Sequence, residues 1–174
     1  DPEPMGLKRM DWSKVKDLQV TMDREAEPLG SDDPLMKLFR PLLAGTQLET
    51  EDLRMAYSAT EDGWTPGAFH SAVDGYGATI VLARTSGGAL IGGYNPLGYD
   101  GFGSDKSTFG SFLFTWPDGD AKLGKPYKLP KISTDQLAVV DRMDQGPQFG
   151  PGDLKILLKQ GAAKKVTSKL IDYT

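Results

Sequence analysis

The chain has 174 residues and a formal net charge of -4, which fits one domain and gives no general electrostatic attraction for nucleic acid. It contains no cysteine, so disulfides, thiolate metal sites and cysteine nucleophiles are excluded. No apolar run approaches the about 20 residues that a membrane-spanning helix needs, so no transmembrane segment is predicted.

Residues 1–31 are predicted to form a charged N-terminal arm that precedes the folded domain. Trp12, Val15 and Met22 recur in it at helical spacing, which indicates a short amphipathic helix. So narrow an apolar face does not hold a helix in water by itself. The helix is therefore expected to pack on its own domain or to dock on a partner, and the second alternative makes these three residues partner-binding candidates.

Two helices are predicted at the start of the folded part. Asp33 followed by Pro34 is typical of a helix start, with a buried stripe of Leu35, Leu38 and Phe39. Thr65 followed by Pro66 begins a second helix that runs to Val73, with Phe69 and Val73 facing the core. Between them, Thr46 and Glu49 resemble a capping box, and the alternation in residues 54–60 is typical of a strand.

Strand signals dominate from residue 77 onward. The segments "GATIVLAR" and "ALIGGYN" around a glycine turn predict a hairpin, in which Gly92 and Gly93 indicate a bulge or a close backbone approach. Further strands are predicted in "SFLFTW", "AKLGKPYKL", "QLAVVDRM" and "DLKILL". This pattern predicts an α+β fold with two antiparallel β-sheets packed as a sandwich and flanked by short helices. Six residues on the apolar phase are expected between the sheets: Ile80, Leu82, Phe112, Phe114, Val139 and Ile156.

The glycine-rich segment "GPQFGPGDLKILL" at residues 146–158 could be a phosphate loop or the entry to a strand. A phosphate loop needs lysine and Ser/Thr after its last glycine, or a helix that follows a G-x-G-x-x-G pattern. Here Asp153 follows Gly152 and would repel phosphate. The segment is therefore predicted to turn into a buried strand, with Leu154, Ile156 and Leu158 inside.

Few residues are candidates for catalysis or metal binding. His70 is the single histidine, has no serine elbow motif near it, and is interpreted as a capping or surface residue. A zinc site needs several His or Cys ligands, and no acidic segment has the register of a calcium loop. No metal site and no cofactor are therefore expected. Paired carboxylates stay open as an alternative because the chain has 24 acidic residues.

Three blocks of the sequence resemble the TLDc domain family. They are "AYSATEDGWTPGAFHSAVDGYGATIVLARTSGGALIGGY", "STFGSFLFTW" and "GPQFGPGDLKI", in the family's order and over roughly residues 33–174. The chain most resembles the short plant and algal members. It departs from the family at Val73, where many members have cysteine, and at Lys155, which replaces a common tyrosine. The family's final strand is expected to be missing, which would leave an exposed sheet edge.

The resemblance implies a TLDc-like domain over residues 32–174 that has no established catalytic activity. The family is linked to protection against oxidative stress, and several members bind the peripheral sector of the V-type ATPase. The resemblance therefore implies a non-catalytic interaction module that docks on a larger protein assembly, and a small carboxylate-dependent hydrolase or lyase is the alternative. The family's glycine and acidic positions fall here on Asp62, Gly63, Asp74, Gly150, Gly152 and Asp153. Trp64, Tyr99 and Phe102 are further partner-binding candidates, since docking requires an exposed aromatic patch.

The likeness to plant members, together with a first residue that is not methionine, predicts an intracellular protein of the chloroplast. A cytosolic protein with a trimmed start is the alternative.

Overall fold

The structure is a computed structural model that describes residues 24–117, 119, 124–132, 137–159, 165–169 and 173. The predictions for Trp12, Val15 and Met22 lie outside the described residues. The last part of the predicted arm, residues 24–31, rests against the domain, since Ala26 is buried and its N–H donates to the carbonyl of Pro41.

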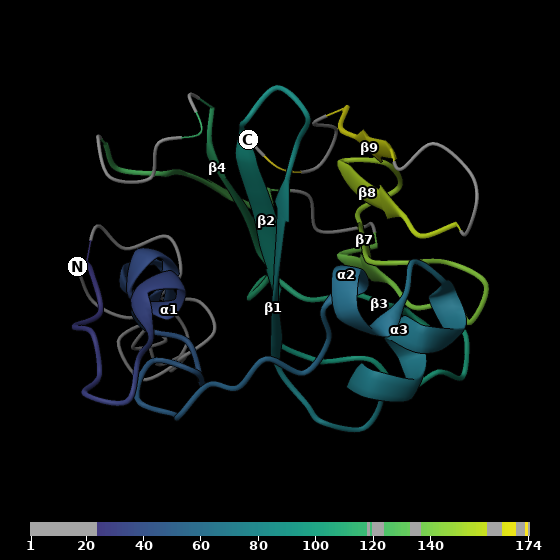
Figure 1. Cartoon of the computed structure of the whole chain (residues 1–174), viewed down its shortest axis with the longest axis horizontal. Coiled ribbons are helices and arrows are strands. Elements are labelled where there is room, and N and C mark those ends of the chain that lie inside the picture. Colours follow the sequence, from purple (N-terminus) through teal and green to yellow (C-terminus); the bar gives the residue numbers. More distant parts are fainter. Residues whose placement is uncertain are drawn as a thin grey trace, which may run out of the picture.

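Two antiparallel sheets form the body of the molecule, as the sequence predicts (Figure 1). The four-stranded sheet has the order β1 (Thr79–Arg84), β2 (Leu90–Asn95), β4 (Phe112–Trp116) and β5 (Tyr127–Pro130). The five-stranded sheet has the order β3 (Asp105–Lys106), β6 (Val139–Val140), β7 (Gln148–Phe149), β8 (Leu154–Leu157) and β9 (Lys165–Thr167). The helices are α1 (Pro34–Phe39), the 3-10 helix η4 (Arg40–Leu43), α2 (Ala59–Asp62) and α3 (Pro66–Val73). The fold is therefore an α+β sandwich.

The hairpin of β1 and β2 stands in the middle of the molecule. Figure 1 shows α1 on one side of it and α3, β8 and β9 on the other. Both faces of the four-stranded sheet are therefore covered, one by the N-terminal helices and one by the second sheet.

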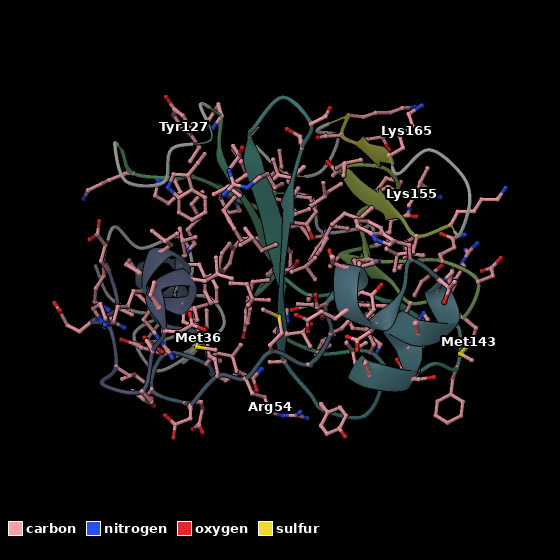
Figure 2. The ribbon with its side chains drawn as sticks, in the orientation of Figure 1. Met36, Arg54, Tyr127, Met143, Lys155 and Lys165 are labelled. Atoms are coloured by element: carbon pink, nitrogen blue, oxygen red, sulfur yellow. The ribbon has the colours of Figure 1, made fainter. Side chains whose placement is uncertain are left out.

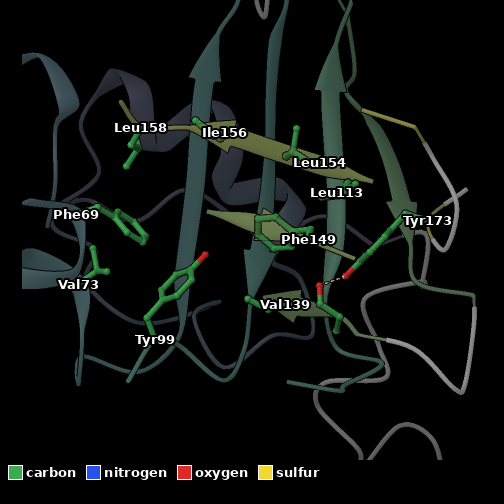
Figure 3. Close-up of a cluster of buried hydrophobic side chains, with 11 residues drawn as sticks. Phe69, Val73, Tyr99, Leu113, Val139, Phe149, Leu154, Ile156, Leu158 and Tyr173 are labelled. Atoms are coloured by element: carbon green, nitrogen blue, oxygen red, sulfur yellow. Dashed lines mark hydrogen bonds between the residues drawn. The ribbon is translucent and has the colours of Figure 1, made fainter. Parts of the chain in front are cut away.

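The core divides into two clusters, one on each face of the four-stranded sheet. The inter-sheet core (Figure 3) includes Leu113, Val139, Phe149, Leu154 and Ile156. The outer-face core, beneath α1 and η4, includes Phe39, Leu43, Tyr94, Phe112, Phe114 and Trp116, with Ile80 and Leu82 packed against it.

The predicted inter-sheet positions are confirmed for Val139 and Ile156 only. Ile80, Leu82, Phe112 and Phe114 belong to the outer-face core, so their placement between the sheets is wrong. Alternation along a strand shows which residues share a face. It does not show which face meets the second sheet when both faces are apolar and covered.

Gly92 and Gly93 mark the predicted close approach, one on each face. A Cβ on Gly92 would lie 2.4 Å from Cζ of Phe114, and a Cβ on Gly93 would lie 2.6 Å from Cζ of Phe149. The pairing of β2 with β1 and β4 runs on without a bulge. The glycines therefore make room for one phenylalanine ring from each core.

Both predicted helix starts are confirmed. The carboxylate of Asp33 accepts a hydrogen bond from the N–H of Met36 at 2.8 Å, and the hydroxyl of Thr65 accepts one from Ala68 at 3.1 Å. Phe69 and Val73 are buried as predicted. Leu35 is exposed, however, and Met36 packs on the outer-face core in its place, so the predicted stripe of α1 is only partly right.

Two local predictions in residues 44–60 are wrong. Residues 54–60 do not form a strand; α2 begins at Ala59 and the segment before it pairs with no described strand. No helix follows Thr46, although its hydroxyl accepts from the N–H of Leu48 and the Glu49 carboxylate accepts from Gly45. These capping contacts instead close a turn.

This turn wraps around the guanidinium of Arg40, which is fully buried. Arg40 donates two hydrogen bonds to the carboxylate of Asp32 and further ones to the carbonyls of Leu48 and Glu51 at 2.8 and 3.0 Å. A buried charge persists only when it is paired and hydrogen-bonded. The Arg40 network therefore holds the loop and α1 on the outer face of the sheet.

The glycine-rich segment turns into a buried strand, as predicted. Gly150 has a φ of 59° between β7 and β8, and burial then alternates from Leu154 through Ile156 to Leu158. Near the C-terminus, Tyr173 forms a bridge with Lys131 next to β5 and donates its hydroxyl to the carbonyl of Ala138 at 2.8 Å (Figure 3).

Candidate functional site

An apolar groove runs along β1, which is the edge strand of the four-stranded sheet. The groove has a volume of about 650 Å³. Its lining comes from α1, from the segment before α2, from β1 and from β8, and includes Met36, Met55, Trp64, Ile80 and Leu158. Among the described residues β1 pairs only with β2, so its outer edge faces this groove. Concave apolar surface beside a strand edge is a common place for a peptide to bind.

The polar groups of the groove are few and mostly engaged. The carboxylate of Asp33 caps α1, and that of Asp52 accepts a hydrogen bond from the hydroxyl of Ser31 at 2.5 Å. The Arg54 guanidinium lies over the ring of Tyr76, 4.5 Å from its centroid. The groove therefore offers an apolar floor with charged groups at its rim, which suits contact better than reaction chemistry.

A second feature is a cluster of three ionisable side chains that are far apart in the sequence. Nδ1 of His70, on α3, lies 2.8 Å from Oδ1 of Asp74 and 4.0 Å from Oδ1 of Asp141. His70 and Asp141 are buried, and the Asp74 side chain is 24% exposed. Together they are the group of His, Asp and Glu residues, within the part of the chain that the structure describes, whose spacing could hold a metal ion.

The loop before β3 supports this cluster. The N–H of Asp100 donates to Oδ2 of Asp141 at 2.8 Å, and Nζ of Lys106 lies 3.1 Å from Asp100 and 3.3 Å from Asp141. The N–H of Phe102 donates to Asp100, which is the largest reason that the pKa of Asp100 falls to about 2; burial opposes this fall, and Lys106 adds to it. Asp100 is therefore a stable anion that shapes the loop.

The prediction that His70 is a capping or surface residue is wrong. The ring is 3% exposed, and its Nε2 lies 2.8 Å from the carbonyl oxygen of Arg142 and 3.1 Å from that of Gln145. Burial lowers the pKa of His70, but the hydrogen bond and the charge of Asp74 outweigh burial and leave the pKa raised. The residue faces inward because Phe69, next to it, is anchored in the inter-sheet core and fixes the rotation of α3.

The six family positions lie in three separate places. Asp62 and Gly63 end α2, where the Asp62 carboxylate accepts from the N–H of Ser58 at 2.7 Å. Asp74 lies at the other end of α3, in the histidine cluster. Gly150, Gly152 and Asp153 form the turn between β7 and β8, where the buried Asp153 carboxylate accepts from the N–H of Tyr173 at 3.2 Å. The structure therefore does not join them into one site.

The partner-binding candidates also differ in position. Trp64 is half-buried and lines the β1 groove, whereas Phe102 is 90% exposed at the tip of its loop. Tyr99 is buried and packs edge-on against Phe69, 5.0 Å between ring centroids, so the interpretation of Tyr99 as a surface contact is wrong. A single sequence shows that a loop is glycine-rich but not which of its aromatic residues folds inward.

Two residues of the candidate sites, Met55 and Asp141, are not predicted as site residues from the sequence. Met55 lines the groove and is 60% exposed, but the sequence places it on a predicted strand. Asp141 joins His70 only through the tertiary fold. In the sequence, Asp141 follows the apolar run "LAVV", which indicates a carboxylate at the end of a strand. The sequence does not indicate which residue this carboxylate faces.

These features define a class: an α+β sandwich domain with an apolar groove at a sheet edge and a buried histidine–carboxylate cluster beneath a glycine-rich loop. A family model described as the TLDc domain matches residues 31–170. The chain therefore belongs to the TLDc domain family. No curated protein and no solved structure matches it. Within the described residues, no helix is long and apolar enough to cross a membrane.

Proposed function

We propose that this chain is a non-catalytic TLDc module that binds a protein partner through the β1 groove. The observation that carries the proposal is the groove itself, which combines an apolar floor with the unpaired edge of a strand among the described residues. An extended peptide can add its backbone hydrogen bonds to such an edge and place alternate side chains in the groove. Trp64 and Met55 supply the adaptable apolar contacts that interfaces favour.

Two observations support a role without catalysis. Both nitrogens of the ring of His70 face protein acceptors and the residue is 3% exposed, so the ring offers no base to a substrate. The chain has no cysteine, so a thiolate cannot scavenge peroxide. A link to oxidative-stress protection would accordingly be indirect and would act through the docked assembly. The hydrolase or lyase alternative predicts substrate turnover by the purified chain.

The resemblance to the family makes the peripheral sector of the V-type ATPase the first assembly to test. Met55→Glu places a charge in the groove, and Met143→Glu is a matched control, because the two methionines are 60% and 57% exposed. Met143 lies beside α3, on the other side of the sheet from Met36 of the groove (Figure 2). Binding of the purified sector to each variant is measured by surface plasmon resonance.

We expect Met55→Glu to weaken binding at least tenfold, about 1.4 kcal/mol, and Met143→Glu to bind like the parent. Equal binding by the parent and Met55→Glu would overturn the groove as the docking surface. A loss in Met143→Glu alone would move docking to the Phe102 loop. If the parent does not bind this sector, the same pair of variants is tested against proteins that the parent captures from cells.

The compartment is a separate proposal. The plant-type resemblance favours the chloroplast over the cytosol, and imaging of the fluorescently tagged protein expressed from its native gene tests it. A diffuse cytosolic signal would remove the chloroplast from the proposal.

A further inference from the structure

The protonation of His70 is set by the backbone. Its Nε2 lies within hydrogen-bond distance of two carbonyl oxygens, those of Arg142 and Gln145. Carbonyl oxygens only accept, so Nε2 carries a hydrogen. In the neutral ring, Nδ1 therefore presents a lone pair to whatever lies in front of it.

Two carboxylates lie in front of that lone pair. Oδ1 of Asp74 is 2.8 Å from Nδ1, and Oδ1 of Asp141 is 4.0 Å from it. All three atoms are electron donors, so a positive charge has to lie between them. A proton on Nδ1 satisfies Asp74 alone. Oδ1 of Asp141, in a fully buried residue, then keeps no hydrogen-bond partner.

A metal ion would satisfy all three atoms. A zinc ion about 2.1 Å from each of its tetrahedral ligands separates these ligands from one another by about 3.4 Å. The two observed distances, 2.8 Å and 4.0 Å, lie on either side of this value, and the side chain of Asp74 is 24% exposed, which lets it adjust and gives an entry path.

The surroundings of the three ligands are those of a metal site. A metal-binding histidine usually donates its other ring N–H to a carbonyl or carboxylate, as His70 does here. The second oxygen of Asp141 is held by the N–H of Asp100 and by Lys106. The carboxylates of Asp100 and Asp141 lie against Lys106, whereas that of Asp74 lies against His70. With three carboxylates and one lysine, the cluster carries negative charge that a divalent cation would balance.

We propose that Nδ1 of His70 and the carboxylates of Asp74 and Asp141 bind a divalent transition-metal ion such as Zn²⁺. An imidazole ligand favours such ions over Mg²⁺ and Ca²⁺, which prefer oxygen ligands alone. The ion would join the C-terminal end of α3 to the segment after β6. A Cβ on Gly101 would lie 2.2 Å from Oδ2 of Asp74 and 3.1 Å from Sδ of Met143, so the site lies directly beneath the loop that presents Phe102.

Binding is measured with the untagged full chain after treatment with a chelator. Zn²⁺ affinity is determined by competition with a chromogenic chelator, and Co²⁺ absorption reports the ligand geometry. We expect one Zn²⁺ per chain, weaker binding of Mg²⁺ and Ca²⁺, and at least tenfold weaker Zn²⁺ binding in Asp74→Asn and Asp141→Asn. Asp144→Asn is the matched control, because this exposed aspartate lies in the same segment as Asp141, and it should bind like the parent.

Three results would overturn the site: no saturable Zn²⁺ binding by the parent, parent-like binding by Asp74→Asn, or a doubly protonated His70 ring in the ¹⁵N NMR spectrum of the zinc-saturated protein. Asp141 is buried, so Asp141→Asn could fail to fold; the partly exposed Asp74 then decides the question. The measurement needs no protein partner. A negative result therefore leaves the docking proposal intact, and a failure of docking leaves the metal site intact.

Discussion

The two faces of the four-stranded sheet are covered in different ways. The inter-sheet core joins strands to strands, so apolar side chains from two sheets cover each other directly. The outer-face core is covered by α1, which has only six residues, and by a loop. A helix this short has little stability of its own. The outer face therefore depends on a buried ion pair, that of Arg40 and Asp32, as well as on apolar packing. The inter-sheet face depends on apolar packing together with neutral hydrogen bonds such as that from Tyr173 to Ala138.

The largest expected effects come from removing one phenylalanine from each core. Phe114→Ala in the outer-face core and Phe149→Ala in the inter-sheet core each remove a ring that is at most 1% exposed. Each should cost about 3–5 kcal/mol, a large share of a total stability of about 5–15 kcal/mol. Urea denaturation followed by circular dichroism should show one transition in both variants, because the same four strands carry both cores. A Phe114→Ala protein whose urea midpoint matches that of the parent would contradict the burial of this ring in the core.

The dependence of the outer face on a buried ion pair is tested by two arginine variants. Arg40→Leu leaves the buried carboxylate of Asp32 without its partner, which should cost about 3–5 kcal/mol. Arg24→Leu removes an ion pair with Glu49 in which the arginine is 48% exposed, and should cost much less, because water screens an exposed pair. Chemical denaturation of both variants measures the difference. Equal costs would show that α1 is held by packing alone.

The same ion pair gives a smaller effect that depends on pH. The hydrogen bond from Arg40 lowers the pKa of Asp32, although burial opposes this. The pair therefore stabilises the fold above the unfolded pKa of about 3.9, and this contribution is lost as the pH falls through the folded pKa. Urea midpoints measured between pH 6 and pH 2 should fall more steeply for the parent than for Asp32→Asn. If the urea midpoints of the parent and of Asp32→Asn fell in parallel with pH, this would contradict the lowered pKa of Asp32.

Much of the fold could be predicted because its signals are local. Asp33 and Thr65 cap their helices where the sequence places them, and the β1–β2 hairpin and the turn at Gly150 follow from glycine and strand patterns. The face assignment of Phe112 and Phe114 could not be predicted, since it depends on which neighbour covers each face. The short strands β3 and β7 have two residues each and carry no periodic signal.

Less of the candidate sites than of the fold can be predicted from the sequence. The cluster around His70 needs Asp141 from a distant segment, and a count of His and Cys residues alone argued against a metal. The aromatic side chain of Trp64 makes it a candidate contact by residue type alone, and it lines the groove. The groove itself arises from the edge position of β1, which only the strand order reveals.

Hydrogen exchange of the β1 amides tests the central claim, that the β1 groove is the docking surface, most directly. Exchange of residues Thr79–Arg84 is measured with and without the purified peripheral sector of the V-type ATPase, or with another partner that binds the parent chain. A partner that adds a strand to β1 should slow the exchange of the amides on the outer edge of this strand and of the segment around Met55. Slowed exchange confined to the loop around Phe102, with β1 unchanged, would contradict the account.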